Sequence, residues 1–160
     1  MFNKASIVEK IIATLSAELE GYARSAKAAR DYAADDQCKA ENKYDTRGLE
    51  SSYLSNGQSR QAAEVMHAMQ QYESLVVRDF APEEPINVGA LLELKRKGKR
   101  LLYFLGPSAG GTEIESEGSE VFVITPQSPI GRQLIGRKCG ERLPIQFGGV
   151  AESYTIAAVV

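Results

Sequence analysis

Residues 8–33, VEKIIATLSAELEGYARSAKAARDYA, decide the fold of the N-terminal half of this chain. Apolar or small side chains recur there in alternating steps of four and three residues, at Val8, Ile12, Leu15, Leu19, Tyr22, Ala26, Ala29 and Ala33. Positions three and four apart share one face of a helix, so this spacing is typical of the seam of a coiled coil. The stretch predicts a long helix that packs against a helical partner.

The partner helix is predicted by a second pattern with the same rhythm, at Leu49, Leu54, Ala62, Val65, Met69, Tyr72 and Val76. Two such helices joined by a short polar stretch fold back most simply as an antiparallel coiled-coil hairpin, because each alone would leave its seam in water. Pro82 and Pro85 then end the second helix. We therefore expect a hairpin domain over residues 1–81 and another domain over residues 82–160.

The C-terminal domain is expected to be a small β-sheet with one short helix. Strand-like runs separated by glycine-rich turns occupy residues 88–94, 100–106, 120–125 and 154–160. Ser128 is a good N-cap for a short helix with Pro129 at its first position. The basic run at 95–100 is interpreted as a solvated β-turn, and contact with an acidic protein surface or with RNA is the alternative. The fold class is thus α+β.

The composition excludes several classes of protein. The chain has 160 residues, is 43% hydrophobic and carries a net charge of −2, which argues against direct binding to naked nucleic acid. Cys38 and Cys139 lie too far apart for a zinc knuckle or a disulfide framework, and we interpret them as free thiols in a reducing cytoplasm. Neither a signal peptide nor an apolar run of about 20 residues is present. We expect a soluble cytoplasmic protein without a membrane partner.

Two motifs resemble those of a known family. Residues 124–141, ITPQSPIGRQLIGRKCGE, closely resemble the C-terminal signature of Gre transcription elongation factors, a "SPIARALIGKKVGD"-like run that follows a strand. Residues 39–44, KAENKY, resemble the "KENAEY"-type run at the hairpin tip of that family, although one residue is missing between Asn and Tyr. The motifs occur in the family's order, and the resemblance covers most of the chain.

The resemblance implies a fold and a function. The fold would be a coiled-coil finger followed by a C-terminal domain like that of FK506-binding proteins. The function would be that of a bacterial factor that binds RNA polymerase through its secondary channel and stimulates cleavage of backtracked nascent RNA. The enzyme would be polymerase itself. The chain alone would bind no cofactor, would meet Mg²⁺, nascent RNA and DNA only within the elongation complex, and would be a monomer.

Acidic residues near the predicted tip are the candidate site. In two-metal phosphodiester hydrolysis, an added carboxylate can help to bind the second metal ion, and another can orient the attacking water. The available acids are Asp35, Asp36, Glu41 and Asp45. The resemblance aligns Glu41-Asn42 with the family's Glu-Asn, but Cys38 stands where the family has Asp, and Asp36 is the nearest upstream acid. We expect Glu41 and Asp36 to share Mg²⁺ with polymerase; solvated acids or helix caps are the structural alternative.

Other functions remain open at this stage. One is a Gre-like regulator that occupies the channel without stimulating cleavage. Another is prolyl isomerisation, which needs an aromatic-lined pocket; the absence of Trp and the expected burial of several C-terminal aromatics argue against it, the aromatics being Tyr103, Phe104, Phe122, Phe147 and Tyr154. Basic residues near the short helix could contact polymerase or RNA but are more often solvated, namely Arg132, Arg137, Lys138 and Arg142.

Overall fold

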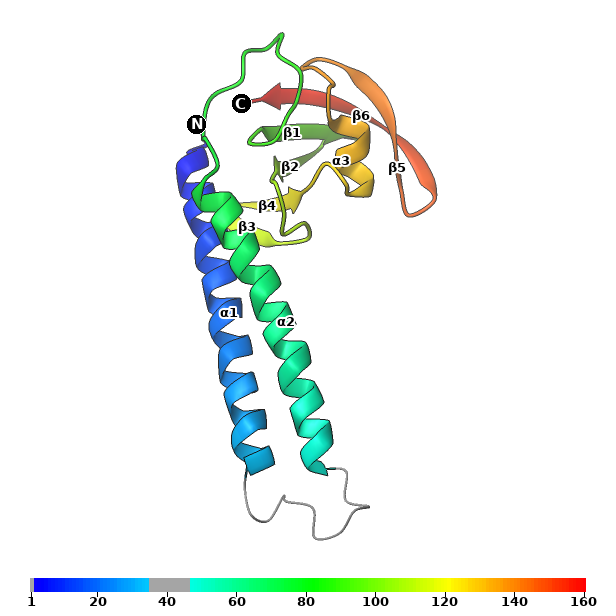
Figure 1. The fold of residues 1–160 in the computed structure, drawn as a ribbon. Helices are drawn as coiled ribbons and strands as arrows, with labels where there is room; N and C mark the ends of the chain where they lie inside the picture. Colours follow the sequence, from blue (N-terminus) through cyan, green and yellow to red (C-terminus); the bar gives the residue numbers. More distant parts are fainter. Residues whose placement is uncertain (1, 35–46) are drawn as a thin grey trace. The chain divides into compact units, whose positions relative to one another are not determined.

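A computed structural model describes residues 2–34 and 47–160 of the chain. Two long helices come first, α1 (Lys4–Ala34) and α2 (Arg47–Glu73). The remainder forms a sheet and one short helix, in the order β1 (Leu91–Arg96), β2 (Lys99–Leu105), β3 (Glu113–Ser116), β4 (Ser119–Ile124), α3 (Pro129–Leu134), β5 (Arg142–Phe147) and β6 (Val150–Val159). The predicted α+β class is confirmed (Figure 1).

The chain divides into two compact units. The hairpin unit comprises Ala13–Gln70, and the sheet unit comprises Met1–Ile12 together with Gln71–Val160. The first turns of α1 and the last turn of α2 therefore belong to the same unit as the sheet. The domain boundary after residue 81 stays a prediction.

In the hairpin unit, α1 and α2 lie side by side and run in opposite directions (Figure 1). Leu15 and Ala26 of the first predicted seam are buried, and Val65 of the second seam is buried as well. Val76 was wrongly assigned to that seam: α2 ends at Glu73, and the Val76 side chain is 76% exposed. Coiled-coil supercoiling of the pair stays a prediction.

The sheet has six strands in the order β3-β4-β2-β1-β6-β5. Neighbours pair antiparallel except β2 and β4, which are parallel. The sequence analysis missed the two edge strands. β3 is only four residues long, and β5 contains Pro144, which a strand tolerates at a sheet edge because an unpaired side needs no N–H donor.

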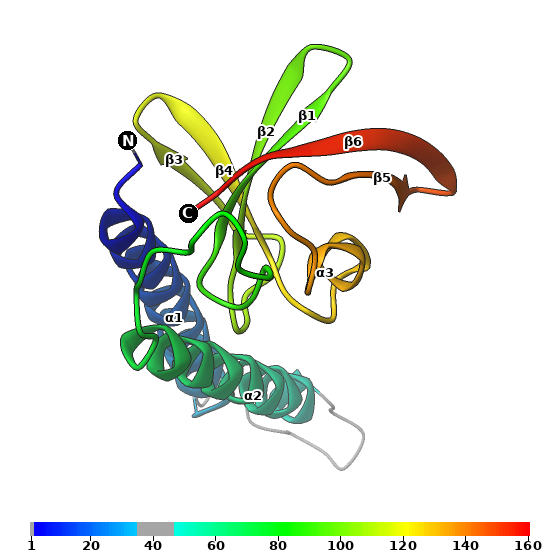
Figure 2. The ribbon, with the colours of Figure 1, turned by 90° about the horizontal axis from the view of Figure 1, so that it is seen from above.

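One face of the sheet packs against α3 to form the main core of the sheet unit (Figure 2). Leu134 of α3 is completely buried there with Leu105 and Ile156. Side chains of the opposite face, such as Phe104 and Val121, are also completely buried. Ile7 and Ile11, in the first turns of α1, are buried in the same unit. The sheet is therefore covered on both faces, but on the α3 face only in part.

Candidate functional site

The predicted tip site lies between the two long helices. α1 ends at Ala34 and α2 begins at Arg47. Asp36 and Glu41, with the alternative acids Asp35 and Asp45, fall outside the described residues. The expected convergence of Asp36 and Glu41 on a shared Mg²⁺ therefore stays a prediction.

The motif at 124–141 builds the turn and helix that follow β4. Ser128 is the N-cap of α3 as predicted: its hydroxyl accepts a hydrogen bond from the Gly131 amide at 3.1 Å and donates one to the Thr125 carbonyl at 2.8 Å. After α3, Gly136 has a φ of 79°, a left-handed conformation that glycine adopts more easily than other residues. The Gly136 amide donates a hydrogen bond to the Ile86 carbonyl at 2.9 Å. The motif thus fixes the start of α3 through local hydrogen bonds and its end through a bond to the segment before β1.

The basic run at 95–100 forms the β1–β2 turn, as predicted. Four of its five basic side chains are paired within the chain: Arg96 and Lys97 with Glu152, and Lys95 and Arg100 with Glu93. Intramolecular pairing lowers the charge that these residues could offer to an acidic partner or to RNA.

Lys4 is a buried cation at the start of α1 that the sequence analysis did not single out. Its ammonium donates hydrogen bonds to the Arg78 and Gly89 carbonyls and lies 4.0 Å from the Asp79 carboxylate. The side chain is only 4% exposed and lies over the Phe80 ring. Burial lowers the Lys4 pKa from its usual 10.5, while the Asp79 carboxylate opposes that shift. Lys4 thereby ties the first turn of α1 to the segment between α2 and β1.

Replacing Lys4 by methionine is expected to change how stability depends on pH. Because the folded-state pKa of Lys4 is lowered, the native chain releases this proton before the unfolded chain does, so Lys4 favours folding increasingly as pH rises toward 10.5. The stability of the wild type relative to Lys4→Met, measured by urea unfolding, should therefore increase as the pH rises toward 10.5. A flat or falling difference between the wild type and Lys4→Met would contradict the expectation.

An apolar groove lies between the β2–β4 pair and the start of α3. It has a volume of about 390 Å³ and is lined by Leu101, Tyr103, Phe122, Pro129, Ile130 and Phe147 among others. The Tyr103 and Phe122 rings are 6.0 Å apart and tilted by 41°. Three of the five aromatics named for a prolyl site thus meet here, whereas Phe104 is buried on the opposite face and Tyr154 is buried in the main core.

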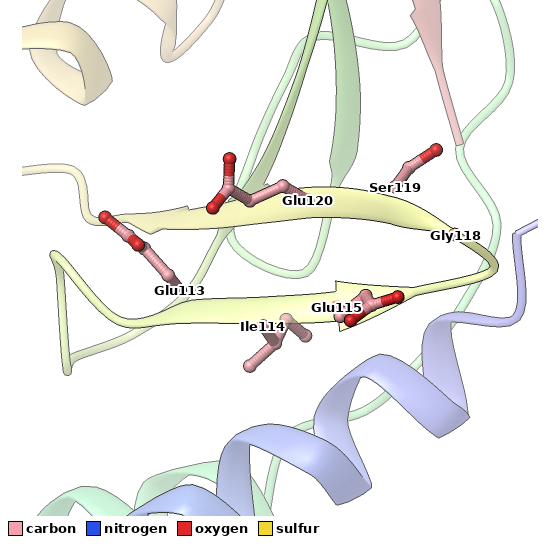
Figure 3. A pocket seen from close by; sticks show the side chains of 6 residues that line it. All are labelled: Glu113, Ile114, Glu115, Gly118, Ser119 and Glu120. Atoms are coloured by element: carbon pink, nitrogen blue, oxygen red, sulfur yellow. The ribbon is translucent and has the colours of Figure 1, made fainter.

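A second hollow, of about 450 Å³, lies on the β3–β4 hairpin (Figure 3). Glu113 and Glu120 project to one side of this hairpin, and Ile114 projects to the other. In the described part of the chain, neither of these two carboxylates forms a salt bridge with a basic side chain. Alternating Glu-Ile-Glu at 113–115 was the signal for a strand with an acidic face that the sequence analysis overlooked.

No cluster of three or more metal-binding side chains occurs among residues 2–34 and 47–160. The same ranges contain no helix long and apolar enough to cross a membrane. Within those ranges, the apolar groove and the acidic hollow are two concave surfaces large enough to hold a peptide side chain.

Comparisons with known proteins give likenesses to solved structures only. No protein-family model matches the chain, and no curated protein matches it. The solved structure of the GreA factor homolog Gfh1 from Thermus thermophilus is 19% identical over 93% of this chain and 94% of its own, with a TM-score of 0.41. Gfh1 from Thermus aquaticus is 20% identical over 94% and 92% of the two chains, also with a TM-score of 0.41.

A third similar structure is the elongation factor GreA/GreB from Nitrosomonas europaea, which is 16% identical over 69% of this chain and 91% of its own, with a TM-score of 0.37. The solved structures that this chain resembles include the GreA factor homolog Gfh1 and a GreA/GreB elongation factor.

Proposed function

We propose that this chain is a bacterial transcription elongation factor that binds RNA polymerase through the secondary channel and stimulates cleavage of backtracked RNA. One observation carries the proposal: four acids, Asp35, Asp36, Glu41 and Asp45, occupy the segment that joins two long paired helices, and a separate sheet unit follows. α1 has 31 residues and thus extends about 46 Å at about 1.5 Å per residue. A helical pair of that length can carry carboxylates into a narrow channel.

The proposed chemistry adds carboxylates to a site that belongs to polymerase. Mg²⁺ in that site supplies the charge stabilisation for phosphodiester hydrolysis. Glu41 would add an oxygen ligand to the weakly held ion, and Asp36 would orient the attacking water or accept its proton. The chain would not be an independent enzyme and would bind no cofactor by itself.

The sheet unit would dock at the mouth of the channel. The motif at 124–141, which resembles the family's C-terminal signature, forms α3, and Ser128 and Gly136 bond its two ends to Thr125 and Ile86. We propose that the chain acts as a cytoplasmic monomer with an FKBP-like C-terminal domain, and that it approaches nascent RNA and DNA only within the elongation complex.

The test uses a stalled, backtracked elongation complex with labelled RNA and Mg²⁺. Addition of the full chain is expected to shorten the RNA rapidly from its 3′ end, and the double variant Asp36→Ala, Glu41→Ala should return cleavage to the rate without factor. The matched control is Glu20→Ala, Asp31→Ala, which removes two exposed acids from α1 and should retain stimulation.

Polymerase binding is measured in the same samples. Binding without stimulated cleavage would replace the proposal by the alternative of a regulator that occupies the channel, an outcome consistent with Cys38 standing at the family's Asp position. Absence of binding would exclude both functions.

A further inference from the structure

The α3 face of the sheet continues as an apolar surface beyond the part that α3 covers. Along β2, Leu101 and Tyr103 share a face with Leu105, and along β4, Phe122 shares it with Ile124, because side chains two apart point to the same side. Leu105 and Ile124 are buried in the core, whereas Leu101, Tyr103 and Phe122 are only partly buried. The row of apolar side chains therefore extends from the core into a groove that residues 2–34 and 47–160 leave open.

Phe147 forms the outer wall of the groove. It stands at the end of β5 next to the glycine turn 148–149, and its side chain is 64% exposed. Val150, across the same turn, is 62% exposed but does not line the groove. Exposed apolar surface beside a concave apolar groove is characteristic of sites at which another molecule binds.

The groove leads into the acidic hollow. A third hollow of about 310 Å³ shares Leu101 and Phe122 with the groove, and it shares Ser119 and Glu120 with the acidic hollow. Arg100 also lines the third hollow, and its charge is paired with Glu93 at 2.8 Å. The shared residues join the three hollows into a track that is apolar at the α3 end and acidic at the β3–β4 turn.

The strand register concentrates negative charge at the acidic end. Glu113 lies directly opposite Phe122, and Glu115 lies directly opposite Glu120. Like charges that face each other across an antiparallel pair destabilise the sheet. A cation bound between them would relieve this repulsion, whereas a phosphate backbone would increase it. The charge thus favours a basic partner and disfavours nucleic acid.

We propose that this track binds an extended peptide segment of a partner protein, with an aromatic or large aliphatic side chain in the groove and a Lys or Arg two residues away. Phe122 and Glu120 are two residues apart on β4, a distance of about 6.6 Å. An extended peptide advances about 3.1 to 3.4 Å per residue, so its residues i and i+2 match the two ends. This binding does not depend on the proposed action at polymerase.

The test titrates the full-length chain, ¹⁵N-labelled, with hexapeptides, which are too short to form helices in water. The probe is Gly-Phe-Ala-Lys-Ala-Gly, and the control peptides replace its Lys by Glu or its Phe by Ala. The probe is expected to shift the amide signals of β2, β4 and the β5–β6 turn. Each control peptide should bind at least about fivefold more weakly than the probe. Added salt should lower the affinity of the chain for the probe.

Variants of the chain locate the two ends of the track. Phe147→Ser should weaken binding of the probe about tenfold, and Val76→Ser, at an exposed apolar position that lines none of the three hollows, should leave its affinity unchanged. The double variant Glu113→Gln, Glu120→Gln should lower the affinity for the probe about fivefold, whereas Glu83→Gln should leave that affinity unchanged. No binding of the probe, equal affinity for the Lys and Glu peptides, or indifference to Phe147→Ser would each overturn the proposal.

Discussion

Replacing Gly106 by alanine is expected to lower the free energy of unfolding of the sheet unit by about 2 to 3 kcal/mol. A Cβ atom at Gly106 would lie 2.0 Å from the hydroxyl oxygen of Tyr72 and 2.9 Å from its ring carbon Cζ. Tyr72 cannot easily move, because it is 1% exposed and its hydroxyl donates a 2.7 Å hydrogen bond to the Ser108 carbonyl. The measurement is urea unfolding of the full chain followed by tyrosine fluorescence.

A double-mutant cycle identifies the clash as the cause. Tyr72→Phe removes the closest atom, so Gly106→Ala should be less destabilising in the Tyr72→Phe background than in the wild type. Gly57→Ala is the matched control, since nothing lies within 4 Å of the added Cβ on that helix. It should leave stability unchanged or raise it by up to about 1 kcal/mol. If Gly106→Ala lowers the free energy of unfolding equally in both backgrounds, the close approach to the Tyr72 hydroxyl is not the cause of the destabilisation.

The second large effect is expected for Leu134→Ala, which should destabilise the sheet unit by about 2 to 5 kcal/mol. Leu134 is the last residue of α3 and is completely buried in the main core. Removing its side chain leaves a cavity that the surrounding β-strands can fill only partly, and it loosens α3 on the sheet. The midpoint of urea unfolding and the protection of core amides against hydrogen exchange should both fall.

The neighbouring Ile135 supplies the control for Leu134. Ile135 is 39% exposed and lies at the C-cap of α3, so Ile135→Ala should lower the free energy of unfolding by less than about 1 kcal/mol. Similar losses for the two substitutions would contradict the position of α3 in this fold. Because the groove borders α3, Leu134→Ala should also lower the affinity of the chain for the peptide probe, whereas Ile135→Ala should preserve that affinity.

Much of the sheet unit could be predicted from local patterns, and the misses have physical reasons. Ser128 and Pro129 predicted α3 correctly, because an N-cap acts within a few residues. β5 was missed because its stabilisation comes from pairing with β6 and from Gln133, whose side chain bonds both the amide and the carbonyl of Gln146. Such long-range pairing leaves little trace in a short segment that contains proline.

The end of α2 was predicted too late. Val76 continued the apolar rhythm, but the helix ends at Glu73 and the Leu75 amide turns back to the Tyr72 carbonyl at 3.2 Å. Periodicity indicates which face of a helix is apolar and does not determine where hydrogen bonding stops.

The sequence by itself determined the two long helices, the order of helices before strands, the capped α3 and the acids in the connection between α1 and α2, because these depend on spacing and on local backbone preferences. Only the tertiary structure decided that Lys4 is a buried cation and that the aromatics of β2, β4 and β5 line a groove. It also decided that Glu113 and Glu120 stand on the same side of the hairpin beside that groove. These features arise from strand register and sheet order, which bring together residues that are distant in the sequence.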